Sequence, residues 1–106
     1  LAVNLTTSPG TATVNGTMTS GDNDYFAVTV APGRTLSATL TPPANADYDL
    51  YLYRTLTSNA AARSTRGTGA VDSASIANTG TTTATYYVRV RYYGGAAAAY
   101  TLQISR

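Results

Sequence analysis

The segment Asp47–Tyr53 alternates between two kinds of side chain. Leu50 and Leu52 point to one side of an extended chain. The other side carries a polar and aromatic set, which consists of Asp49, Tyr51 and Tyr53. A period of two is typical of a β-strand with one face in a core. The second face is unusual, because it presents large aromatic rings where small polar side chains are expected.

The segment Tyr86–Tyr93 repeats this pattern. Val88 and Val90 share one side with Tyr86 and Tyr92, and we expect that side to face the core. The opposite side carries Tyr87, Arg89, Arg91 and Tyr93. If the two segments are neighbouring strands, their outward side chains form a single patch of tyrosine and arginine.

Alternation elsewhere predicts the remaining strands. We expect them near residues 1–5, 11–19, 25–30, 35–40, 71–77 and 100–104, with turn residues between them. The predicted core set is Phe26, Val28, Val30, Leu36, Leu40, Leu50, Leu52, Val88, Val90, Leu102 and Ile104. About seven or eight strands joined by turns favour an all-β fold, an antiparallel β-sandwich, with a small barrel as the alternative.

Two connections carry specific expectations. Ala31–Arg34 has proline and glycine where a type II turn requires them, so we expect strands 25–30 and 35–40 to pair as an antiparallel hairpin. Arg54–Gly69 is polar and small and lacks a period, which predicts a long loop between strands.

The length bounds the organisation of the chain. Its 106 residues suit one domain over 1–106, in which residues 1–13 are either a linker or the first strand. No apolar run approaches the roughly 20 residues of a membrane span, so we expect no membrane partner. The chain starts at Leu1, and we expect it to be an excised or mature piece of a longer protein.

Composition removes most catalytic chemistry. The chain has no Cys, His, Trp, Lys or Glu; its five acids are all aspartate and its seven bases all arginine. The usual general bases, the thiol nucleophile and the common zinc ligands are therefore missing, and we expect no enzyme activity. The net charge of +2 is too small to indicate a nucleic-acid partner.

Four aspartates form two Asp-x-Asp pairs. Asp22 and Asp24 belong to a turn cluster, and Asp47 and Asp49 flank the start of a strand. Aspartate in such places usually accepts hydrogen bonds from nearby backbone N–H groups. The alternative is a calcium site, which would need both pairs to meet, because calcium takes several oxygen ligands.

Five motifs in order carry a resemblance to a known family. They are Gly21–Phe26, Pro32-Gly33, Asp47–Leu52, Tyr86–Val90 and Tyr100–Ile104. In this order the chain resembles the bacterial pre-peptidase C-terminal domain, whose relatives include the collagen-binding domains of clostridial collagenases. The resemblance spans about Val14 to Ile104. It implies a jelly-roll-like β-sandwich, secreted and extracellular, that accompanies a secreted hydrolase and either adheres to substrate or is removed during maturation.

The resemblance also suggests a binding face and a metal. In the collagen-binding relatives, tyrosines on one sheet face bind the ligand, and acidic residues of an N-terminal linker help to hold calcium. No acid precedes Asp22 here, so we expect no cofactor and no tightly bound calcium. The candidate substrate-binding residues are Tyr51, Tyr53, Tyr87, Arg89, Arg91 and Tyr93. Tyrosine supplies contact area and a hydroxyl, and arginine supplies a planar fork for carbonyls and carboxylates.

The expected partners are an insoluble protein polymer, collagen in particular, and the catalytic domain of a parent peptidase, with this domain a monomer. Three other readings stay open. The tyrosines and arginines could stabilise the sheet without binding any ligand, or a loop could cover them. The chain could be a cleavable or stabilising C-terminal domain without a ligand. It could also be a carbohydrate-binding module, because aromatic rows stack on sugar rings.

Overall fold

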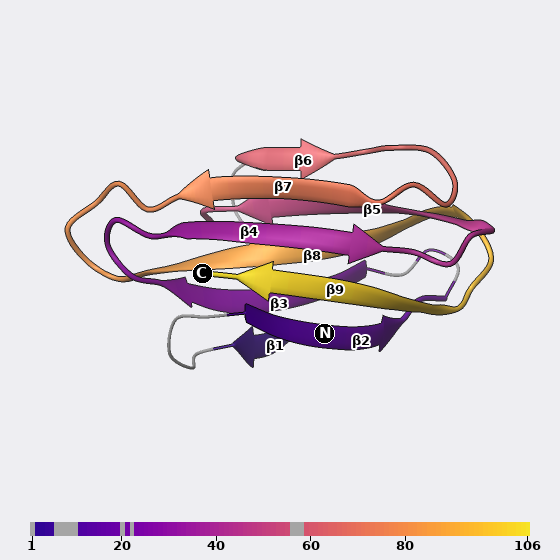
Figure 1. Cartoon of the computed structure of the whole chain (residues 1–106), viewed down its shortest axis with the longest axis horizontal. Helices are drawn as coiled ribbons and strands as arrows, with labels where there is room; N and C mark the ends of the chain where they lie inside the picture. Colours follow the sequence, from indigo (N-terminus) through magenta and orange to yellow (C-terminus); the bar gives the residue numbers. More distant parts are fainter. Residues whose placement is uncertain (1, 6–10, 20, 22, 56–58) are drawn as a thin grey trace.

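A computed structural model describes residues 2–5, 11–19, 21, 23–55 and 59–106 (Figure 1). These residues form two sheets that pack face to face. In spatial order, the five-stranded sheet contains β1 (Ala2–Leu5), β3 (Asn23–Val30), β8 (Ala84–Gly95), β5 (Ala46–Tyr53) and β6 (Ala62–Ser64). The four-stranded sheet contains β2 (Thr11–Thr17), β9 (Ala99–Ser105), β4 (Thr35–Thr41) and β7 (Asp72–Ala77).

The predicted antiparallel β-sandwich is confirmed. Neighbouring strands are antiparallel, with the exception of β1, which runs parallel to β3. The described residues contain nine strands, one more than the upper number expected. They contain no helix that is long and apolar enough to cross a membrane.

The core between the sheets contains all eleven residues of the predicted set. Tyr48, Tyr86 and Tyr100 join them, together with Met18 and Ile76. Each Val, Leu, Ile or Phe side chain that leaves water on folding contributes about 1.5–3 kcal/mol. Tyr48 retains polar partners, since its hydroxyl donates to the Ala96 carbonyl over 2.6 Å and accepts from the Ala98 amide over 3.0 Å. Alternation therefore identified the buried faces correctly.

The predicted hairpin of strands 25–30 and 35–40 is wrong. β3 and β4 belong to different sheets, and the connection between them crosses the sandwich. The type II turn itself forms, because Gly33 has φ of 76° and the Arg34 amide donates to the Ala31 carbonyl over 3.1 Å. The buried Asn78 holds this crossing in place with two hydrogen bonds of 2.9 Å. Its backbone carbonyl accepts from the Gly33 amide, and its side-chain Nδ2 donates to the Val30 carbonyl. Both strands have one buried face, so their alternation would be the same in a hairpin or across a core.

The segment Arg54–Gly69 is not entirely loop. Its residues 62–64 form β6, which pairs with β5 through Leu50 opposite Ser64, Tyr51 opposite Arg63, and Leu52 opposite Ala62. Residues 56–58 lie outside the described part of the chain. Three residues are too few to show a period of two, which is why alternation did not predict this strand.

Candidate functional site

The two strands that carry the candidate site are direct neighbours. β5 and β8 pair antiparallel over the whole length of β5. Their register places Asp49 opposite Arg91, Tyr51 opposite Arg89, and Tyr53 opposite Tyr87. Residues directly opposite each other point to the same side of a sheet, so the outward side chains share one face. We call this the outer face, the side of the five-stranded sheet that is turned away from the core.

Tyr93 reaches the outer face by a different route. The register shifts between Asp47, which lies opposite Gly94, and Tyr48, which lies opposite Tyr92. Tyr93 is therefore the extra residue of a β-bulge and has no residue opposite it in β5. Its side chain is 65% exposed.

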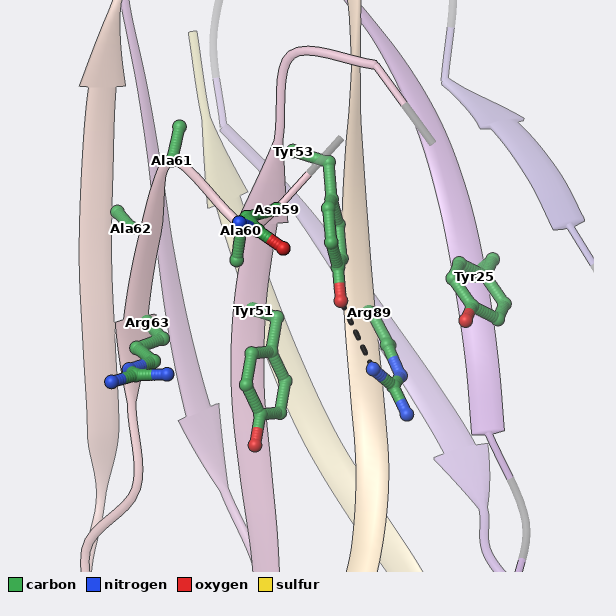
Figure 2. A pocket seen from close by; sticks show the side chains of 9 residues that line it. All are labelled: Tyr25, Tyr51, Tyr53, Asn59, Ala60, Ala61, Ala62, Arg63 and Arg89. Atoms are coloured by element: carbon green, nitrogen blue, oxygen red, sulfur yellow. Dashed lines mark hydrogen bonds between the residues drawn. The ribbon is translucent and has the colours of Figure 1, made fainter. Parts of the chain in front are cut away.

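Two residues that the sequence did not suggest extend the site on both sides. Tyr25 of β3 lies opposite Arg89, and Arg63 of β6 lies opposite Tyr51. Figure 2 shows the result as an alternation across four neighbouring strands, in the order Tyr25, Arg89, Tyr51 and Arg63. We call these four residues the Tyr–Arg row. Tyr25 could have been found, since it alternates with the inward Phe26, but Arg63 gave no signal.

Arg89 holds the centre of the row. Its Cζ lies 5.1 Å from the centroid of the Tyr51 ring and 5.9 Å from that of Tyr25. Its Nη1 donates to the Tyr53 hydroxyl over 3.0 Å, and its Nε donates to Oδ1 of Asn23 over 2.8 Å (Figure 2). Burial alone would lower the pKa of Arg89, but the hydrogen bond to Tyr53 and the neighbouring tyrosines outweigh it and raise the pKa. The guanidinium is therefore charged, and its contacts fix the positions of three tyrosine rings.

A groove of about 920 Å³ opens over the row. Tyr51 and Tyr53 supply two nearly parallel rings, whose centroids are 6.5 Å apart at an interplanar angle of 26°. Tyr25 of β3 and Arg89 of β8 line it on one side, and β6 and the segment before it line it on the other (Figure 2). The complete lining is Tyr25, Tyr51, Tyr53, Asn59, Ala60, Ala61, Ala62, Arg63 and Arg89.

Tyr53 differs from the expectation that all the outward tyrosines are open to solvent. It lies on the outer face, but it is only 9% exposed. Its hydroxyl accepts a hydrogen bond from Arg89. Residues 59–61 line the groove beside Tyr53, and the Ala61 amide donates to the Leu52 carbonyl over 2.8 Å. The contact with Arg89 and the neighbouring residues 59–61 therefore accompany the low exposure of Tyr53. The sequence could not indicate this low exposure, because residues 59–61 have no hydrophobic period.

A second cavity, of about 410 Å³, shares the lining residue Tyr51 with the groove. It is lined by Asp47, Asp49, Tyr51, Thr65, Arg66, Gly67, Arg91 and Tyr93. Asp49 is only 4% exposed, although it points outward. Burial, together with the charges of Asp47 and Asp72, raises the pKa of Asp49 to about 6, and the opposing effect of Arg91 is smaller.

Of the four aspartates, the structure describes Asp24, Asp47 and Asp49, and Asp24 lies apart from the other two. Asp24 is on β3 and Asp47 and Asp49 are on β5, with β8 between these strands. Oδ2 of Asp24 accepts a hydrogen bond from the Tyr100 hydroxyl over 2.6 Å, and Asp22 lies outside the described residues. Among the residues that the structure describes, no three His, Cys, Asp or Glu side chains form a group that could hold a metal ion. The calcium set of four aspartates includes Asp22, so the expectation of no tightly bound calcium stays a prediction.

Several solved structures share the fold. The pre-peptidase C-terminal domain of collagenase from Bacillus anthracis matches with a TM-score of 0.75 and 18% identity, over 99% of this chain and 95% of that one. Aeromonas hydrophila PliG, a periplasmic inhibitor of g-type lysozyme, matches with a TM-score of 0.70 and 14% identity, over 98% and 96%. The Yersinia pseudotuberculosis-derived mitogen matches with a TM-score of 0.69 and 19% identity, over 92% and 86%.

No family model matches the sequence, and no curated protein matches it. The similarity to a pre-peptidase C-terminal domain, first indicated by five sequence motifs, is confirmed at the level of the fold. The same fold is found in a lysozyme inhibitor and in a mitogen, so the fold alone does not define a function.

Proposed function

We propose that this chain is a non-catalytic accessory domain of a secreted bacterial protease and that it binds a protein polymer, collagen in particular, along the groove over the Tyr–Arg row. The observation that carries the proposal is the row itself, in which four strands place tyrosine and arginine alternately beside a groove of about 920 Å³. Partners in this proposal are the polymer and the catalytic domain of the parent peptidase, and the setting is extracellular.

The chemistry of the groove suits an extended polypeptide. Tyrosine rings such as those of Tyr51 and Tyr25 bring large contact area with few rotatable bonds, and interface energy concentrates on Tyr and Arg. The pyrrolidine rings of a collagen-like chain could lie on these rings, and its many exposed carbonyls could accept from Arg63, which is exposed at one end of the row. The fold of a collagenase accessory domain supports the same reading by analogy.

Sedimentation with insoluble polymers tests the proposal. The isolated domain is mixed with insoluble collagen, cellulose, chitin and casein, and the bound fraction is measured. We expect binding to collagen. Tyr51→Ala should weaken it about 5- to 150-fold, because an interface anchor is worth roughly 1–3 kcal/mol. Gln103→Ala, a matched control on the exposed face of β9 in the other sheet, should bind like wild type.

The other outcomes distinguish the alternative functions. Binding to cellulose or chitin but not to collagen would favour a carbohydrate-binding module, and binding to none of the four would favour a cleavable or stabilising domain without a ligand. Normal binding by Tyr51→Ala would place the ligand elsewhere. The isolated domain should hydrolyse neither casein, gelatin nor glycosides, and turnover that disappears with one aspartate substitution would contradict the non-catalytic assignment.

A further inference from the structure

The groove over the Tyr–Arg row is lined by two positive charges. Among the residues that the structure describes, its lining contains the guanidinium groups of Arg63 and Arg89 and no carboxylate. Tyr51 lies opposite Arg89 of β8 and opposite Arg63 of β6, and Figure 2 shows the two arginines on either side of it. Neighbouring strands are about 4.8 Å apart, so the backbones of the two arginines are roughly 10 Å apart. A ligand group beside the Tyr51 ring therefore lies between two cations.

Arg63 has its whole guanidinium group available for a ligand. Its side chain is exposed, and within the described part of the chain it has neither a hydrogen bond nor an ion pair. Arg89 differs, because its Nε donates to Asn23 and its Nη1 donates to Tyr53. A guanidinium pairs with a carboxylate through two parallel N–H···O bonds, which requires adjacent donors that no protein group occupies. Arg63 meets this condition.

The carboxylates of the second cavity do not balance this charge within the groove. Asp47 and Asp49 line the second cavity, and neither lines the groove. Asp49 lies opposite Arg91, and the charge of Arg91 lowers the pKa of Asp49 against the larger effects that raise it. Asp49 therefore faces an arginine that is not part of the Tyr–Arg row. The charges of Arg63 and Arg89 remain for a ligand.

The exposed surface shows the same asymmetry of charge. Of the four aspartates that the structure describes, Asp49 and Asp72 are buried, and Asp24 and Asp47 are half-buried. Four arginines are exposed, and they are Arg34, Arg54, Arg63 and Arg66. In the described part of the chain, every exposed charged side chain is therefore positive. Such a surface attracts an anionic partner and disfavours a cationic one.

We propose that the polymer segment in the groove carries a carboxylate side chain, glutamate or aspartate, which pairs with Arg63 beside Tyr51. The inference rests on the proposed function, since it names a side chain of the ligand that the Tyr–Arg row holds. Arg63 supplies the hydrogen bonds, and the charge of Arg89 adds to the attraction. The Tyr51 ring packs against the methylene groups of the acidic side chain. The preferred occupant of the groove is an acidic stretch of polypeptide.

The first experiment uses a probe that does not depend on collagen. N-acetyl-glutamate methylamide is titrated into the 15N-arginine-labelled domain at pH 7.5, and the side-chain Nε–H resonances are followed, assigned with Arg63→Gln and Arg34→Gln. The Arg63 resonance should shift and saturate at a lower probe concentration than that of Arg34, an exposed arginine just before β4 of the other sheet. The uncharged glutamine analogue should shift Arg63 much less. Equal responses at Arg63 and Arg34, or to the two probes, would overturn the assignment.

The second experiment links the carboxylate to the polymer. Triple-helical peptides of Gly-Pro-Hyp repeats carry a single central glutamate, glutamine or lysine, and their affinities are compared by fluorescence polarisation. The glutamate peptide should bind about fivefold tighter than the glutamine peptide, as one ion pair at an open site provides, and the lysine peptide should bind most weakly. Arg63→Gln should bring the ratio of glutamate to glutamine affinity to about one. Arg34→Gln, which removes the same charge outside the groove, should leave the ratio as in wild type.

The two experiments separate the two proposals. A specific response of Arg63 to the glutamate probe with no binding of any peptide supports the carboxylate site and rejects a collagen-like polymer. Binding of the glutamine peptide without a preference for glutamate supports the groove and rejects the carboxylate site, as does a preference that survives Arg63→Gln. Tighter binding of chondroitin sulfate than of the glutamate peptide would reject an acidic polypeptide in favour of a sulfated sugar. No response in either experiment rejects both proposals.

Discussion

Asp49 provides the sharpest test of the electrostatics of the site. The residue is 4% exposed, and burial together with the charge of Asp47 raises its pKa from 3.8 to about 6. In the unfolded chain the group regains water and titrates near its ordinary value. Asp49→Asn keeps the shape of the side chain and removes the charge, so this variant isolates the cost of ionisation in the folded protein.

The sign and size of the effect follow from linkage. Between pH 4 and pH 6 the folded protein binds the proton of Asp49 more tightly than the unfolded chain does, so the free energy of unfolding falls as the pH rises through this window. Each pH unit between the two pKa values is worth about 1.4 kcal/mol, which sets an upper bound of roughly 3 kcal/mol. Since Asp49 lines an open cavity, solvent screening reduces the expected value to about 1–2 kcal/mol.

Urea unfolding of wild type and Asp49→Asn at intervals from pH 4 to pH 8 measures this effect. The difference between the two proteins cancels the titration of distant groups. Relative to wild type, the variant should gain about 1–2 kcal/mol between pH 4 and pH 6.5 and change little above pH 7. A difference that is independent of pH would refute the reasoning, as would a relative gain for wild type as the pH rises.

Three other tests give distinct readouts: two comparisons of paired variants and one chelator treatment. Gly16→Ala places a methyl group against the Tyr100 ring and should lower the free energy of unfolding by about 1–3 kcal/mol through overpacking. Gly94→Ala meets open space and should leave it unchanged. Equal denaturation midpoints for the two variants would contradict this. Tyr53→Ala should destabilise by about 2–3 kcal/mol and Tyr93→Ala by less than about 1 kcal/mol, because only Tyr53 is buried; thermal melts that rank them the other way would reverse the assignment. A chelator should leave the melting temperature within about a degree, and a fall of several degrees that calcium restores would reveal a calcium site.

Alternation predicted the faces of the strands but not their neighbours. Phe26 and Leu36 were both assigned to the core, and both are buried, yet their strands pair in different sheets. A period of two reports only whether a side chain points towards the core, and every strand of a sandwich satisfies it equally. The partner of a strand depends on hydrogen bonds between distant segments, such as those that Asn78 makes to the turn at Gly33 and to Val30.

For the candidate site, too, the sequence predicted which side chains point outward but not all of their neighbours. The outward positions of Tyr51 and Arg89 followed from alternation, and their pairing followed once β5 and β8 were known to be neighbours. Tyr25 and Arg63 entered the row only through register, which no local pattern encodes. The burial of Tyr53 depends on an aperiodic segment and on a hydrogen bond from another strand.

The two arginines of the Tyr–Arg row have different roles, which the sequence alone could not distinguish. Arg89 uses its Nε and Nη1 within the protein and lies between two rings, so it holds the tyrosines at fixed positions. Arg63 is exposed at the edge of the groove, where its guanidinium can meet a ligand. Rings that are held before binding lose less conformational freedom when a ligand arrives, and this increases affinity without adding a contact. Arg89 would then act on binding through Tyr25, Tyr51 and Tyr53, whereas Arg63 would act directly.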